Sequence, residues 1–123
     1  MLIFISMQNS KNQSNVDISI IRNLIKNGKK LTSQEQQLIF SQKDAKELLL
    51  TYLQKYKLCL EAEIALVSSA NAKELLKVYC DFCPLYEEAE VEMVLRPNAN
   101  ELLDIYEEKY ELGNEASVIA MHL

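Results

Sequence analysis

Apolar residues recur at helical spacing in the second half of the chain, with polar residues between them. An apolar stripe of this kind predicts an amphipathic helix that buries one face. The pattern predicts one helix from Ala72 and a shorter helix from about Glu88. The stripe of the first helix comprises Leu75, Leu76, Tyr79 and Cys83, at positions i, i+1, i+4 and i+8.

This two-helix pattern repeats every 27 residues. The period divides the chain into units 18–44, 45–71, 72–98 and 99–123, and the second and third units share 12 of 27 positions. Short helix pairs cannot bury an apolar face alone, so neighbouring units must stack on a common core. The sequence therefore predicts an all-α fold, a solenoid of about four helix-turn-helix repeats in a single domain, 18–123.

Caps and breakers agree with this division. Asp44, Asn71 and Asn98 each precede a predicted helix, with a glutamate three residues into that helix (Glu47, Glu74 and Glu101). This spacing predicts capping boxes, and Thr32 with Glu35 predicts another in the first unit. The helix-breaking residues all fall in predicted turns. They are Gly28, Pro84, Pro97 and Gly113.

The unit reads Ala-x-Glu-Leu-Leu-x-x-Tyr, followed by Leu-x-x-Glu-Ala. This motif resembles the short HEAT-like repeats of bacterial α-solenoid proteins, closely over 45–123 and loosely over 18–44. The resemblance implies a superhelical fold and binding of a protein or peptide. It implies no particular activity, because the motif fixes a fold type.

Residues 1–17 are expected to form a flexible arm or a mis-called extension, with Met7 as an alternative start. The apolar run Met1–Ile5 lacks the basic region of a signal peptide and is too short to cross a membrane. The chain carries three cysteines, which suit a reducing compartment better than a disulfide framework and predict a cytoplasmic location.

The formal net charge is −5, which argues against a broad nucleic-acid surface. Charge falls along the units, from +3 in 18–44 to −5 in 99–123. Arg22 and Lys29 replace apolar members of their columns, as expected of a capping repeat. The last unit keeps Val118, Ile119 and Met121, so self-association through the C-terminal repeat is one hypothesis. The alternative is a last helix that covers itself.

Tyrosine repeats at Tyr52, Tyr79 and Tyr106. Two interpretations are open: inter-repeat packing, which we favour, and a concave binding surface. In the second interpretation the tyrosines and the flanking Glu47, Glu74 and Glu101 would bind a protein or peptide, and a basic peptide would suit them. The other paired glutamates, including Glu63 and Glu90, are expected to form a solvated face.

Cys80 and Cys83 form a C-x-x-C motif. A redox site would need it at a helix N-terminus, and zinc would need two more ligands. The motif falls near a predicted helix C-terminus, which favours a structural role. The single histidine, His122, has no nucleophile at a suggestive spacing. We therefore expect a non-enzymatic interaction module without metal or cofactor. The alternatives are a metal-binding or redox protein using Cys80 and Cys83, and a self-assembling structural repeat protein.

Overall fold

The computed structural model of the chain describes residues 19–122, and all regular structure in that range is helical. The predicted all-α class is confirmed there, and the expected arm, 1–17, lies outside the described residues. A helix over residues 19–26 comes first. It is followed by α2 (Ser33–Leu38), the 3-10 helix η1 (Ile39–Ser41), α3 (Ala45–Leu53), α4 (Leu60–Ser68), α5 (Ala72–Cys80), α6 (Glu87–Val94), α7 (Ala99–Tyr106) and α8 (Asn114–Ala120).

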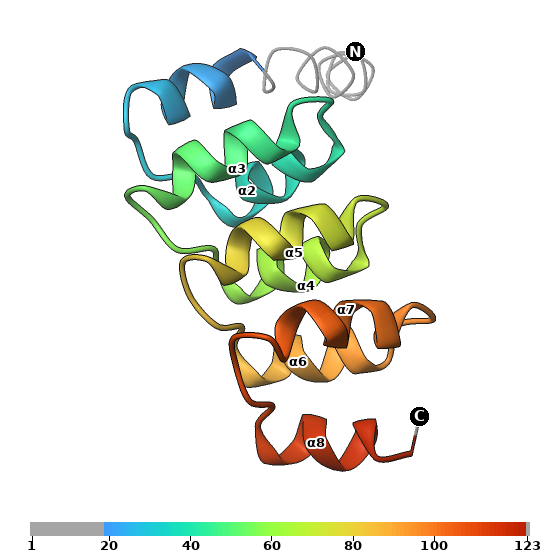
Figure 1. The fold of residues 1–123 in the computed structure, drawn as a ribbon. Helices are drawn as coiled ribbons and strands as arrows, with labels where there is room; N and C mark the ends of the chain where they lie inside the picture. The colour runs from blue at the N-terminus through green and yellow to red at the C-terminus, as the bar shows by residue number, and fades with distance from the viewer. Residues whose placement is uncertain (1–18, 123) are drawn as a thin grey trace, which may run out of the picture.

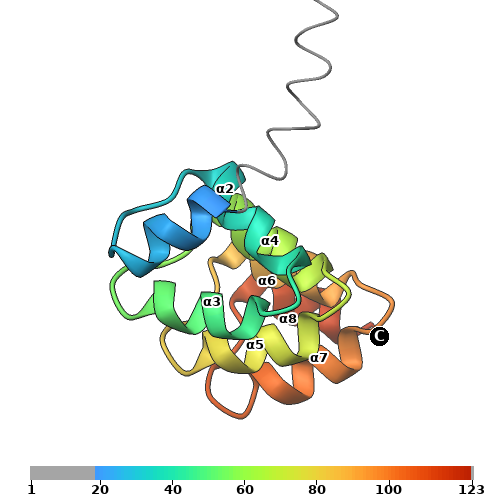
Figure 2. The ribbon, with the colours of Figure 1, turned by 90° about the horizontal axis from the view of Figure 1, so that it is seen from above.

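The helices form two layers (Figures 1 and 2). In one layer α3 packs on α5 and α5 on α7, and in the other α2, α4, α6 and α8 pack in the same succession. Each helix thus contacts the helix two places further along the chain. Contacts between α4 and α5 and between α6 and α7 join the layers. The longer loops lie at one edge of this stack, which we call the loop edge; it comprises 27–32, 54–59, 81–86 and 107–113, and the shorter turns lie at the opposite edge.

The core between the layers is built from residues 27 positions apart. Leu49 and Leu76 are fully buried in successive helices of one layer. In the other layer an alanine occupies the equivalent place in α4, α6 and α8, and all three are fully buried: Ala62, Ala89 and Ala116. A side chain of this size lets neighbouring helices approach closely, and the close approach brings larger side chains on both sides into contact.

The helices of the first layer begin at Ala45, Ala72 and Ala99, as predicted. Their predicted capping boxes are wrong, because the side chains of Asp44, Asn71 and Asn98 make no cap hydrogen bond. The turn before each helix satisfies a different group, because the first amide of the helix donates to a backbone carbonyl three residues earlier, over 3.0–3.2 Å. The capping box of Thr32 and Glu35 is confirmed.

The breakers lie between helices, as predicted. Gly28 has a φ of +70°, a left-handed conformation that suits glycine. Pro84 and Gly113 lie in loops before α6 and α8, and Pro97 lies in the turn before α7. Among the described residues, the structure contains no helix with the length and apolar character needed to cross a membrane.

Candidate interaction surface

A buried polar side chain occupies the same place in α2, α4 and α6. These residues are Gln36, Glu63 and Glu90, and each lies in the core. One end of each side chain meets a tyrosine hydroxyl 16 residues later; for Glu90 and Tyr106 the two oxygens are 2.6 Å apart. Tyr79 donates to Glu63 in the same way, and the Gln36 amide lies 3.4 Å from the Tyr52 hydroxyl.

A side-chain oxygen of each residue, the single amide oxygen in Gln36 and the second carboxylate oxygen in Glu63 and Glu90, accepts a backbone N–H that lies 23 residues later. These amides belong to Cys59, Tyr86 and Gly113, at 2.7–2.9 Å. Each amide stands immediately before the next helix of the same layer. We call each set of polar side chain, tyrosine and amide a rung. A rung joins three successive helices and satisfies buried polar groups that would otherwise destabilise the core.

The rungs correct the expectation that Glu63 and Glu90 lie on a solvated face. Burial raises the pKa of Glu63, opposed by hydrogen bonds from Tyr79 and the Tyr86 amide. Burial and the bond to Glu90 raise the pKa of Tyr106. One signal in the sequence could have indicated the rungs: Gln36, Glu63 and Glu90 stand 27 residues apart, each five residues after a leucine that repeats with the same period.

Tyr52, Tyr79 and Tyr106 are at most 2% exposed. Side chains this deeply buried are not available to a partner, so the packing interpretation describes them and the binding-surface interpretation of the tyrosines is wrong. The flanking Glu47, Glu74 and Glu101 are exposed on the first turns of α3, α5 and α7. Lys73 lies 3.7 Å from Glu101, so part of this acidic row is neutralised on the surface itself.

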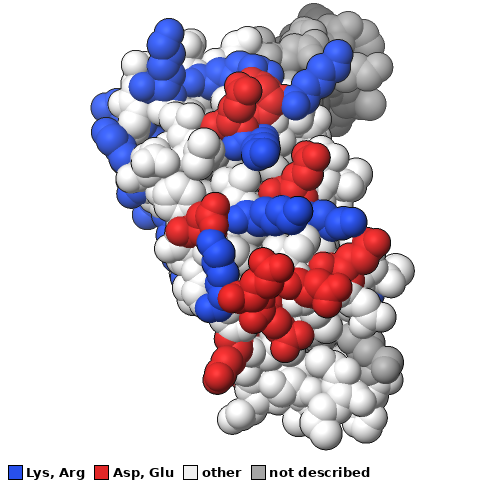
Figure 3. Space-filling model, viewed as in Figure 1, with Lys and Arg blue, Asp and Glu red and all other residues white. Residues whose placement is uncertain are grey.

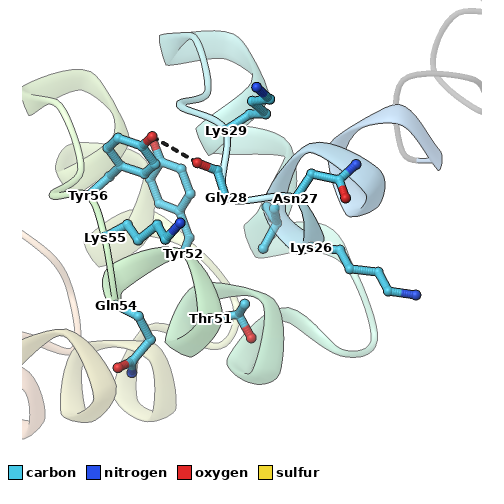
Figure 4. Close-up of a pocket in the computed structure, with 10 residues that line it drawn as sticks. Lys26, Asn27, Gly28, Lys29, Thr51, Tyr52, Gln54, Lys55 and Tyr56 are labelled. Atoms are coloured by element: carbon cyan, nitrogen blue, oxygen red, sulfur yellow. Dashed lines mark hydrogen bonds between the residues drawn. The ribbon is translucent and has the colours of Figure 1, made fainter.

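The loop edge carries a hollow of about 250 Å³ between the helix of residues 19–26 and α3. Its walls include the rings of Tyr52 and Tyr56, whose centroids are 5.2 Å apart. The Tyr56 hydroxyl donates to the Gly28 carbonyl over 2.9 Å and fixes the loop against α3. Figure 4 shows Lys55 extending across the hollow toward Gly28, while Lys26 and Lys29 point outward.

A second hollow of about 200 Å³ adjoins the first and shares Gln54, Lys55 and Tyr56 with it. Lys57 and the exposed ring of Phe82 extend its lining into the next loop. We call the two together the lysine groove, defined by Lys26, Lys29, Lys55, Lys57, Tyr56 and Phe82. No acidic residue lines either hollow.

A hollow of about 550 Å³ lies at the other end of the loop edge, beside Tyr106 and Tyr110. Its charged lining is Glu87, Glu90 and Glu111, and we call it the acidic hollow. Figure 3 shows the same reversal across the molecule: charged side chains are mostly basic toward the top and mostly acidic around α7, above an uncharged surface at α8.

The C-terminal residues of the self-association hypothesis are partly accessible. Val118 is 57% and Met121 81% exposed, whereas Ile119 is half-buried. They lie on or next to α8 and share no contact with the lysine groove at the opposite end of the stack (Figure 1). Exposed apolar side chains of this kind are compatible with a contact surface.

Cys80 lies where thiol chemistry is disfavoured. Cys80 ends α5 in the core, and burial raises its pKa to about 12. A reactive thiol needs the opposite shift, because the thiolate is the nucleophile and the metal ligand. Cys59 and Cys83 are half-buried free thiols. Within residues 19–122, no cluster of three His, Cys, Asp or Glu side chains is placed to hold a metal ion.

No family model matches the chain, and neither does a curated protein or a solved structure. The resemblance to HEAT-like repeats therefore stays a prediction that rests on the repeated motif.

Proposed function

We propose that the chain is a short α-solenoid of four 27-residue repeats that acts as a non-enzymatic module for binding a protein or peptide. The observation that carries the proposal is the lysine groove. It consists of two hollows that share Gln54, Lys55 and Tyr56 and extend over three successive loops, lined by charged and aromatic side chains. A concave surface with a few convergent polar groups is the usual form of a binding site.

The rungs support a scaffold role. They use the buried polar side chains to hold successive helices in register. The loops are thereby held at fixed spacing, and a preorganised surface loses less entropy when a partner binds. Function in such a protein lies in the loop residues that the stack presents.

A second candidate is self-association through Val118, Ile119 and Met121. The exposure of Val118 and Met121 favours it. If it holds, light scattering will show a molar mass that rises with protein concentration, and Ile119→Glu will lower that mass. A mass equal to one chain at all concentrations would exclude it.

The binding proposal is tested by panning a random peptide library on the immobilised full chain, followed by titration of enriched peptides in solution. We expect saturable binding of one sequence class. Library panning that enriches no sequence class, on protein shown to be folded by circular dichroism, would contradict the proposed function.

A further inference from the structure

We propose that the lysine groove binds an acidic peptide segment of another protein, one that carries carboxylates on both sides of an apolar side chain. This inference rests on the proposed binding function and names the class of its partner. It also replaces the basic peptide suggested by the glutamate row with a ligand of opposite charge.

Charge is the first argument. The lining of the groove contains four lysines and no acidic residue, in a chain whose net charge is −5. Like charges gathered around a hollow raise the local potential and attract the opposite charge. Ion pairs among the described residues use other cations, namely Arg22, Lys73 and Lys109. The ammonium groups of the groove therefore remain available to a ligand carboxylate.

Shape is the second argument. Gly28 adopts its left-handed conformation where the Lys55 side chain lies against it, so a side chain at position 28 would meet Lys55. The bond from Tyr56 to the Gly28 carbonyl closes this wall. The groove is thus formed before a ligand arrives, and its central lysine is placed across it (Figure 4).

The aromatic side chains that line the groove indicate that the ligand carries an apolar side chain. Phe82 is 38% exposed at the far end of the groove, beside the partly exposed ring of Tyr56. The next exposed ring, Tyr86, lies 3.9 Å below the Lys57 ammonium, which it holds near this end. A peptide along the groove would place an apolar side chain on Phe82 and carboxylates beside the lysines.

The acidic residues on the rest of the loop edge argue against a long polyanion, such as a nucleic acid, as the ligand. Loop 107–113 carries Glu107, Glu108 and Glu111, and the acidic hollow lies beside it. A nucleic acid following the edge would leave the lysines and meet these carboxylates within a few helix spacings. A short acidic segment ends before it reaches them.

Fluorescence anisotropy with the full chain tests the proposal. The probe is a labelled synthetic peptide with glutamates on both sides of a central leucine; a second peptide carries lysine at each glutamate position. We expect saturable binding of the acidic peptide only, weakened by added salt because the pairs are solvent-exposed. Lys29→Glu with Lys55→Glu should reduce affinity at least tenfold, and the Gln substitutions should reduce it less.

The matched control is Lys46→Glu with Lys77→Glu, which changes net charge equally on exposed positions of α3 and α5 outside the groove. It should leave affinity within twofold of the unsubstituted chain. Equal losses in both double variants would overturn the proposal, because net charge alone would then explain binding. Circular dichroism melting confirms that each variant is folded.

Two other results would overturn it while leaving the proposed function standing. One is preferential binding of the lysine peptide, which would move the site to the acidic surfaces. The other is a concentration-dependent dimer that Lys29→Glu with Lys55→Glu abolishes, because the occupant would then be the acidic loop of a second copy.

Discussion

The lysine groove and the acidic hollow have walls of the same construction, although they lie at opposite ends of the loop edge. In each, two tyrosines four residues apart pack with tilted rings, 5.2 Å between centroids in one and 5.4 Å in the other. In each, the outer hydroxyl donates to a backbone carbonyl, that of Gly28 in the preceding loop or that of Cys80 at the end of α5. The inner hydroxyl accepts a buried amide, from Leu31 or Leu85, at 3.0 or 3.1 Å.

The lining charges differ completely. Position 57 is lysine in the groove, and the residue 54 places later, Glu111, is an acid in the acidic hollow. The polar side chain of the rung also changes, from Gln36 to Glu90. Tyrosine and backbone contacts therefore set the geometry of each hollow, while its charge comes from exposed residues at its rim and, in the acidic hollow, also from the buried rung residue Glu90.

The largest expected effect is a difference in stability between matching tyrosine substitutions in the two hollows. Tyr106→Phe removes a hydroxyl that donates to the Glu90 carboxylate, whereas Tyr52→Phe removes one that faces the neutral Gln36 amide. Hydrogen bonds to charged groups contribute about 1.5–3 kcal/mol and neutral ones about 0.5–1.5 kcal/mol. Tyr106→Phe should therefore lower the free energy of unfolding by about 1–2 kcal/mol more than Tyr52→Phe, measured by urea denaturation.

Both substitutions also leave one amide, that of Leu31 or Leu85, without its hydroxyl acceptor, so this loss cancels in the difference. Each variant thus serves as the control for the other. Equal destabilisation would show that the change from glutamine to glutamate does not alter the strength of a rung.

The helices were predictable from the sequence because their signals are local. The apolar stripe of Leu75, Leu76 and Tyr79 fixes a buried face, and Pro84 and Gly113 fix where helices cannot continue. The capping boxes failed because residue spacing does not fix the backbone conformation of the cap residue. Asp44 and Asn71 have ψ angles of 30° and 25°, whereas Thr32, which does cap its helix, has the extended ψ of 167° that an N-cap usually adopts.

The site was not predictable in this way, because it depends on contacts between repeats. Glu63 and Glu90 look like surface residues until the stack brings Tyr79 and Tyr106 against them. Lys29 and Lys55 lie 26 residues apart in the chain, and they line one hollow only because the helix of residues 19–26 lies beside α3. The charge difference between the two ends was visible from the sequence; the hollows were not.

An intermediate loss of stability is expected from substitution of Gly28, a residue of the lysine groove with no counterpart in the acidic hollow. The residue 54 places later is Phe82, and no residue other than glycine has a positive φ in the described chain. Gly28→Ala forces a left-handed alanine, at about 1–2 kcal/mol, and pushes against the Lys55 side chain. We expect that loss in urea denaturation and a smaller one for Gly28→Asn, since asparagine tolerates this conformation. Equal losses would indicate that crowding, rather than backbone strain, dominates.

The smallest effect concerns the rung between the two hollows. Glu63 has a pKa raised above its ordinary value by burial. A carboxyl group of this kind stabilises the fold fully below its unfolded pKa, and this contribution is lost as pH rises through its folded pKa. The free energy of unfolding should therefore fall as pH increases above about 4.5, the ordinary value for glutamate.

Glu63→Gln should remove this part of the pH dependence. The amide does not titrate, and Gln36 shows that glutamine fits the same place, accepting from a backbone amide and approaching a tyrosine hydroxyl. Above the folded pKa of Glu63 the variant should be the more stable protein, because it buries no charge in the core. The control is Glu61→Gln, an exposed position on the same helix, which should leave the pH profile unchanged. Urea denaturation between pH 4 and pH 8 provides the measurement. An unchanged slope in Glu63→Gln would mean that Glu63 has the same pKa in the folded and the unfolded chain. The burial of its carboxyl group in the rung would then have no effect on its protonation.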